Sequence, residues 1–287
     1  MKKILFTLLA FCFVSLQVNA ATAFDATAAQ KRLNNIAYVL IKKNTLPDGM
    51  TVKVEVNDEV NAYATMNKEI YVYSGMFNVA TTDEELAAIM SHEMGHILNG
   101  HNAKQSILTS LIQSITGSIK ADTTAKAVGV IAAQELSTSK ISRKDEFEAD
   151  ITAVDLLHNA GYNPLSLISV LNKICGNYVD VVSSHPSGEK RLQNVYDYVD
   201  YNYPEWTKKG YTTDSYKKAY ALISLNVQER NANPKKVQKW QKEQIKLQTQ
   251  KIKRMKKMLK SNNGWNSAYN TLLLLNSNQS SESSTQQ

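Results

Sequence analysis

His92-Glu93-Met94-Gly95-His96 is the stretch of sequence that decides how the rest of this chain is interpreted. Two histidines four residues apart point the same way from a helix, so both imidazoles can bind one Zn²⁺. A glutamate between them can take a proton from a metal-bound water and pass it to a leaving amine. The pentapeptide therefore indicates a hydrolytic zinc site, provided that it lies on a helix and that a further ligand exists.

The residues before the motif predict that helix. Thr82-Asp83-Glu84-Glu85 places a carboxylate three residues after a hydroxyl, which is the pattern of a capping box. A helix that begins there carries both histidines on one face. The other elements that we expect are helices over 26–42, 142–159, 164–175 and 231–260, a strand over 51–56, and a strand region over 61–73 that is clearest at 69–73.

The site needs a third protein ligand, because a catalytic zinc usually has three and an open position for water. His101 is the nearest candidate. It follows His92 by nine residues, whereas the third histidine of a metzincin follows by ten, and Asn99 stands where the metzincin glycine belongs. We therefore expect His101 to be a helix-end histidine that faces solvent or a carbonyl, not a ligand.

Glu146 and Asp150 form a better candidate pair, because they lie four residues apart on one helical face. The small residue Ala149 beside them would let this helix approach the first one closely. Glu146 could then bind the metal, and Asp150 could accept the remaining N–H of a ligand histidine. The alternative is a solvated acidic helix face, which we expect for Asp145, Glu148 and Asp155.

These paired motifs resemble the HtpX/CAAX-prenyl-protease-like peptidases, family forty-eight of the metallopeptidases, which are of the gluzincin type. The resemblance covers about Lys31 to Tyr198 and includes Ser184-His185-Pro186-Ser187 and Arg191. It implies a zinc metalloendopeptidase with one Zn²⁺ per chain. The ligands implied are His92, His96 and Glu146, with Glu93 as the base and Asp150 supporting a ligand.

Two further residues have possible roles at this site. In soluble envelope members of the family the His-Pro segment can lie close to the metal, so His185 is a candidate to cap the zinc in a resting state. The alternative for His185 is a structural turn before a helix. Arg191 could help to hold the oxyanion, or it could only pair with a carboxylate.

The N-terminus has the pattern of a signal peptide over residues 1–20. Lys2 and Lys3 precede an apolar stretch that ends in the small-residue site Val18-Asn19-Ala20. We expect cleavage after Ala20 and export to the periplasm or cell envelope, with secretion and an uncleaved anchor as the alternatives. Integral-membrane relatives carry several long hydrophobic spans, and the sequence after this segment shows none.

The expected fold class is α+β and mainly helical: a zincin-like metallopeptidase domain over 21–205, with a small sheet beside the metal-binding helix. A basic helical extension over 206–260 and a polar, disordered tail over 261–287 complete the chain. The resemblance to soluble envelope members of the family implies a role in protein quality control, with unfolded or misfolded envelope proteins as substrates. A chaperone-like or binding module with little or no turnover is the alternative.

The C-terminal region accounts for the basic charge of the chain. The net charge is +7, yet residues 234–260 alone carry eleven Lys or Arg against one acid, Glu243. This segment could contact an anionic membrane or an acidic partner through one face. The alternative is a solvated helix that packs its other face on the body. Nucleic acid is not an expected partner of an exported protein, and the sequence does not predict the oligomeric state.

The strand before the metal-binding helix suggests how a substrate binds. We expect the strand over 70–73 to border the cleft, so an extended peptide could pair with its edge through main-chain hydrogen bonds. Such pairing gives affinity without demanding one sequence, as unfolded substrates require.

Overall fold

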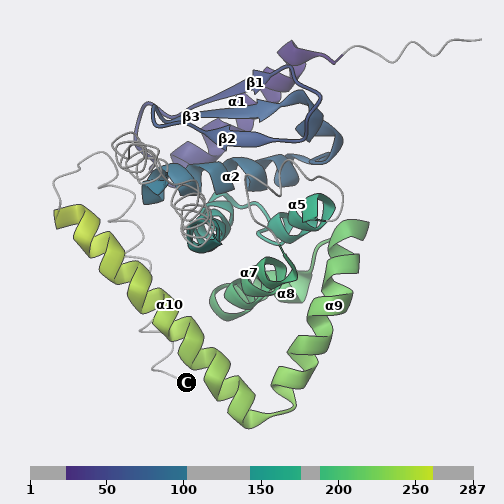
Figure 1. Ribbon diagram of the computed structural model, residues 1–287, viewed down its shortest axis with the longest axis vertical. Helices are drawn as coiled ribbons and strands as arrows, with labels where there is room; N and C mark the ends of the chain where they lie inside the picture. The colour runs from purple at the N-terminus through teal and green to yellow at the C-terminus, as the bar shows by residue number, and fades with distance from the viewer. Residues whose placement is uncertain (1–23, 102–142, 176–187, 261–287) are drawn as a thin grey trace, which may run out of the picture.

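The computed structural model describes residues 24–101, 143–175 and 188–260. It is mainly helical with one small sheet, which confirms the expected α+β class (Figure 1). The signal-peptide segment, His185 and the polar tail lie outside the described residues. The elements are α1 (Ala26–Lys43), β1 (Thr51–Glu55), β2 (Ala62–Ala64), β3 (Glu69–Tyr73), the 3₁₀ helix η1 (Ser74–Asn78), α2 (Asp83–Asn99), a helix over 143–160, α5 (Ser166–Cys175), α7 (Glu189–Asn202), α8 (Pro204–Lys209), α9 (Asp214–Asn231) and α10 (Pro234–Lys260).

The sheet has the strand order β1-β3-β2, with β1 parallel and β2 antiparallel to β3. Ile70 and Val72 of β3 are fully buried and face the core, whereas the alternate residues Glu69, Tyr71 and Tyr73 are partly exposed. β3 therefore has a paired strand on each side. The expectation that a substrate pairs with the edge of 70–73 is wrong, because β3 is the central strand and has no open edge. The order of strands in a sheet depends on contacts that the local sequence does not encode.

The outer edge of β1 is covered by a side chain from α1. The Gln30 amide donates to the carbonyl of Val52 and accepts from the N–H of Val54, both at 2.8 Å. Gln30 thus satisfies the same backbone groups that another strand would use. The other outer strand, β2, lies beside α2 (Figure 1).

Helix α2 begins where the sequence predicts and is the most buried helix of the fold. Thr82 caps it by accepting the N–H of Glu85 at 3.1 Å, but the other half of the capping box is absent. The Glu85 carboxylate instead accepts the N–H of Thr81 at 3.0 Å and pairs with Lys173 of α5 at 2.6 Å. Every residue from Glu85 to Leu98 is buried, so the histidine motif lies inside the molecule.

The 143–160 helix crosses α2 in direct backbone contact. A Cβ placed on Gly95 would lie 2.8 Å from the carbonyl oxygen of Ala149 and 3.0 Å from its Cα. Small residues on both helices therefore permit the close approach that Ala149 predicted. Asn99 strengthens it by donating to the hydroxyl of Thr152 at 3.0 Å.

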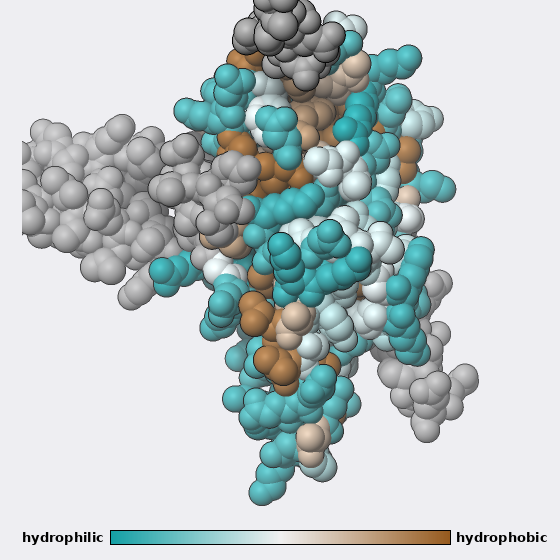
Figure 2. Space-filling model, turned by 90° about the vertical axis from the view of Figure 1, so that its right-hand side faces the viewer, coloured by the Kyte–Doolittle hydropathy of each residue, from teal (hydrophilic) through white to brown (hydrophobic). Residues whose placement is uncertain are grey.

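The C-terminal helices α9 and α10 form a V along the body (Figure 1). α9 buries Tyr216, Ala219 and Ile223 and packs mainly on α5, so the core continues past residue 205. The division between 21–205 and 206–260 stays a prediction. The face on the α9 side is mostly hydrophilic with separate hydrophobic patches (Figure 2). No described helix is long and apolar enough to cross a membrane.

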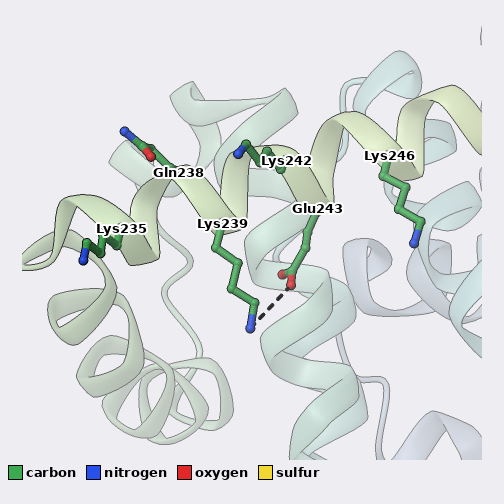
Figure 3. A pocket seen from close by; sticks show the side chains of 6 residues that line it. All are labelled: Lys235, Gln238, Lys239, Lys242, Glu243 and Lys246. Atoms are coloured by element: carbon green, nitrogen blue, oxygen red, sulfur yellow. Dashed lines mark ion pairs between the residues drawn. The ribbon is translucent and has the colours of Figure 1, made fainter.

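Helix α10 packs one face on the body and presents lysines on another. Met255 and Gln244 are buried, and the guanidinium of Arg230 lies 3.9 Å from the ring centroid of Trp240. Lysines extend from the exposed part of the helix (Figure 3). This is the arrangement that the solvated-helix alternative expects, and contact with a membrane or acidic partner stays a prediction.

The Gly95 contact can be tested by the sign of one substitution. Gly to Ala inside a helix normally stabilises by about 0.8–1.0 kcal/mol. For Gly95→Ala we expect the opposite, a loss of about 1–3 kcal/mol in the free energy of unfolding, because the new methyl meets rigid backbone. Urea unfolding of the chelator-treated protein measures this. A stabilised Gly95→Ala protein would contradict the packing described.

Candidate metal centre

Three side chains bring metal-ligating atoms to one point. His92 Nε2 and His96 Nε2 are 3.1 Å apart, and the Glu146 carboxylate lies 3.3 Å from the first and 3.2 Å from the second. Ligand atoms around a tetrahedral zinc with bonds near 2.0–2.1 Å lie about 3.3–3.4 Å apart. The three residues therefore fit a small divalent metal ion, and α2 and the 143–160 helix each contribute to the set.

Asp150 supports this group from one turn further along its helix. Its carboxylate lies 3.0 Å from His92 Nδ1, as the sequence predicts for a residue that orients a ligand. Arg191 of α7 binds Asp150 through two hydrogen bonds of 2.8 and 2.7 Å and lies 2.9 Å from Glu146. The structure thus places Arg191 on carboxylates, and its part in holding an oxyanion stays a prediction.

Burial and charge act in opposite directions on these groups. Burial disfavours the charged imidazolium of His92, but Glu146 and Asp150 outweigh it and raise the pKa of His92 to about 10. For His96 burial prevails and lowers the pKa. Burial would raise the pKa of Asp150, yet Arg191 and His92 lower it. Without a metal, His92 is therefore the imidazole that holds the extra proton.

Glu93 lies between the two histidines in sequence and is buried on the same helix, 3 % exposed. Its carboxylate is near enough to His96 to favour the charged imidazole there, against the larger effect of burial. A buried carboxylate close to a metal site is placed to accept a proton from a water in that site.

The structure places His101 beside a candidate ligand and away from solvent. Gly100 ends α2 in a left-handed conformation with φ 70°, and His101 is only 3 % exposed. His101 Nδ1 lies 3.0 Å from His96 Nδ1, so the solvent-facing expectation is wrong. That His101 is not a ligand stays a prediction.

The acidic residues near His101 also differ from expectation. Asp145 is buried and Glu148 partly so, and they lie 3.6 and 3.3 Å from His101 Nε2. The prediction of a solvated acidic face is therefore wrong for both. It is also wrong for Asp155, which is fully buried and accepts hydrogen bonds from the hydroxyls of Tyr198 and Tyr203. Burial would raise the pKa of Glu148, but His101 and Arg254 lower it to about 2. His101, Asp145 and Glu148 form a second group whose spacing could also suit a cation.

Comparison with known proteins now decides the family. Residues 27–199 match the family described as peptidase family M48. The chain belongs to peptidase family M48. It is 31 % identical over 177 residues to the metalloprotease LoiP of Escherichia coli, covering 58 % of this chain and 69 % of LoiP. It is 29 % identical over 177 residues to the metalloprotease YcaL of the same species, covering 58 % and 68 %.

A further relative is more distant. The beta-barrel assembly-enhancing protease of Escherichia coli is 23 % identical over 162 residues, with 48 % of this chain and 32 % of that protein covered. Together, the family and these relatives make this M48 protein a metalloendopeptidase that hydrolyses peptide bonds with the help of a metal ion. The metal, its ligands and the substrate belong to the proposal below.

The raised pKa of His92 predicts that metal binding releases a proton. At pH 8 a histidine with an ordinary pKa of about 6.5 is neutral, whereas His92 with a pKa of about 10 is protonated and must lose its proton to bind a metal. Calorimetric titration with zinc in buffers of different ionisation enthalpy should show about two protons released per metal at pH 8, one from His92 and about one from the metal-bound water.

The same shift sets how the metal-free protein depends on pH. A raised folded-state pKa adds stability that is fully present below about pH 6.5 and is lost as the pH rises towards about 10.

Asp150→Asn should reduce the proton release at pH 8, because it removes one of the two carboxylates that hold the proton. Release of only one proton by the wild-type protein would contradict this account.

Proposed function

We propose that this M48 peptidase holds one Zn²⁺ on His92, His96 and Glu146, and that Glu93 is its catalytic base. The observation that carries the proposal is the convergence of two imidazole nitrogens, 3.1 Å apart, on the Glu146 carboxylate, whose oxygens lie 3.3 and 3.2 Å from them in a buried site. Two imidazoles and a carboxylate form a ligand set that catalytic zinc sites use.

The chemistry follows from where these side chains lie. A zinc ion bound there lowers the pKa of its water towards about 7 and polarises the scissile carbonyl. Glu93 takes the proton of the attacking water and returns it to the departing amine, so the peptide bond breaks without a covalent enzyme intermediate. Asp150 and Arg191 keep His92 and Glu146 in place during this exchange.

The alternative is a chaperone-like or binding module that keeps the fold with little turnover. Binding alone would not need a carboxylate at position 93 beside two imidazoles, and Glu93 is present and buried. Cleavage of unfolded casein, compared with the Glu93→Gln variant, separates the two functions.

We further propose that the enzyme acts on unfolded or misfolded proteins of the cell envelope, in the periplasm. Two observations support this location and role: the signal-peptide pattern of residues 1–20, and the similarity to a relative named as a beta-barrel assembly-enhancing protease.

We propose that an extended substrate binds to β2 through main-chain hydrogen bonds. β3 is paired on both sides and Gln30 covers β1, whereas β2 is an outer strand that lies beside α2. Recognition of this kind tolerates many sequences. A sharp sequence preference in a peptide library would count against it.

For α10 we propose contact with an anionic membrane surface through its exposed lysines. Four exposed lysines lie along the first half of α10 (Figure 3): Lys235, Lys239, Lys242 and Lys246. Lys239 is paired only loosely, 4.0 Å from Glu243. The buried face of α10 packs on the body, so the contact is with the surface of the membrane and not an insertion.

Sedimentation with vesicles tests the contact of α10. The protein should pellet with vesicles that contain anionic phosphatidylglycerol and not with neutral ones, and binding should fall as salt screens the charges. Replacing Lys239, Lys242 and Lys246 by Gln should abolish it, while the same change at Lys217 and Lys218 of α9 should not. Equal binding to neutral vesicles would exclude this role.

The Glu93→Gln variant tests the mechanism. It should bind zinc as the wild-type protein does and lose at least about 100-fold in casein cleavage, because the base is gone while the ligands remain. Glu84→Gln, on the first turn of the same helix, is the matched control and should keep normal activity. Normal turnover by Glu93→Gln would contradict the assigned base.

A further inference from the structure

His101 and the last turns of α10 take no part in the proposed catalysis, yet together they reach a proposed metal ligand. Arg254 of α10 pairs with the Glu148 carboxylate, Glu148 lies 3.3 Å from His101 Nε2, and His101 Nδ1 lies 3.0 Å from His96 Nδ1. The four side chains thus form a continuous chain from the last turns of α10 to the proposed metal site.

Metal binding by His96 would fix which atom donates and which accepts at each contact of this chain. If His96 binds a metal through Nε2, its Nδ1 carries the hydrogen and donates to His101 Nδ1. His101 must then carry its own hydrogen on Nε2, where it meets the Glu148 carboxylate. Glu148 accepts from both His101 and Arg254, so every polar group in the chain has a partner.

The corresponding contact of the other histidine gives a point of comparison. His92 Nδ1 meets the Asp150 carboxylate directly at 3.0 Å, and Asp150 is held by Arg191. His96 reaches its carboxylate through one more imidazole, and an arginine again completes the chain. Partners of this kind fix the tautomer and orientation of a ligand histidine and raise its basicity.

We propose that His101 is a positioning residue for His96, and that α10 sets the strength of metal binding through Arg254 and Glu148. This inference rests on the proposed function, since it takes His96 as a ligand. It gives the C-terminal helix a role at the active site that does not depend on any contact with membranes. It also explains why His101, at the wrong offset for a ligand, is buried.

The second group of possible ligands, His101, Asp145 and Glu148, has a different explanation in this scheme. A cation bound there would need a lone pair on His101 Nε2. In the proposed chain of contacts this nitrogen carries a hydrogen, which it donates to Glu148. It would also compete with Arg254, which already pairs with Glu148. The proposal therefore expects one metal per chain.

Zinc affinity, measured on the full chain by competition with a chromogenic chelator, tests the chain of contacts. His101→Leu should weaken zinc binding about 10- to 100-fold. His101→Asn should retain most of the affinity, because its amide oxygen can still accept from His96 Nδ1. Arg254→Gln should weaken binding about two- to fivefold, as expected for a partly exposed ion pair.

A double variant and a matched control separate the chain from general loosening of α10. Once His101→Leu is present, adding Arg254→Gln should weaken zinc binding no further. Lys251→Gln removes the other cation by which α10 reaches the 143–160 helix, at Asp155, and should leave zinc affinity unchanged. An equal loss for Lys251→Gln and Arg254→Gln would overturn the role of Arg254.

The tautomers give a readout that a purely structural role would not move. In zinc-loaded protein with ¹⁵N-labelled histidine, His96 should be protonated at Nδ1 and neutral His101 at Nε2. A His101 protonated at Nδ1, an unchanged affinity in His101→Leu, or a second metal per chain that His101→Leu removes would each overturn the proposal. If the wild-type chain binds no zinc, the proposed function itself fails. If it binds zinc with unaltered affinity in all these variants, only the inference about His101 fails.

Discussion

The contact between Gly95 and Ala149 is the constraint on which the metal centre depends. Two helices can bring short side chains from both backbones to one point only if the backbones nearly touch. A Cβ on Gly95 would lie 2.8 Å from a carbonyl oxygen of the other helix, so no larger residue fits without moving it. Because the helices are this close, Glu146 reaches both histidines and Asp150 reaches His92.

Balanced charge is the second requirement of this buried site. Ionised groups inside a protein are tolerated when they are paired and hydrogen-bonded. Glu146 and Asp150 face Arg191 from α7 and, without a metal, the protonated His92, so the four charges cancel. A divalent ion that replaces the proton is held by the same carboxylates. Arg191 thus ties a third helix to the site without itself being a ligand.

Local sequence patterns predict much of this site, because its two halves each lie on a single helix. The spacing of His92 and His96, and of Glu146 and Asp150, places each pair on one helical face, and the structure brings the two faces together. The class of the fold and the start of α2 also follow from local patterns. The features that local patterns do not predict depend on contacts between separate elements. β3 is paired on both sides because β1 (Thr51–Glu55) lies beside it, although β2 (Ala62–Ala64) comes between the two strands in the sequence.

The predictions that His101 and Glu148 face solvent are wrong for a related physical reason. An offset of nine residues excludes one known ligand spacing, but it does not show that a left-handed Gly100 at the end of α2 places His101 next to His96. Glu148 belongs to an acidic run that reads as solvated, and only the packing of α10 brings Arg254 to it. Both depend on a left-handed glycine and a distant helix, and neither leaves a periodic pattern in the sequence.

The most direct test of the account is anomalous diffraction at the zinc edge from crystals of the zinc-loaded protein. The account predicts a single anomalous peak per chain, about 2.0–2.2 Å from His92 Nε2, His96 Nε2 and a carboxylate oxygen of Glu146. A peak among His101, Asp145 and Glu148 instead, or a zinc bound without Glu146, would contradict it.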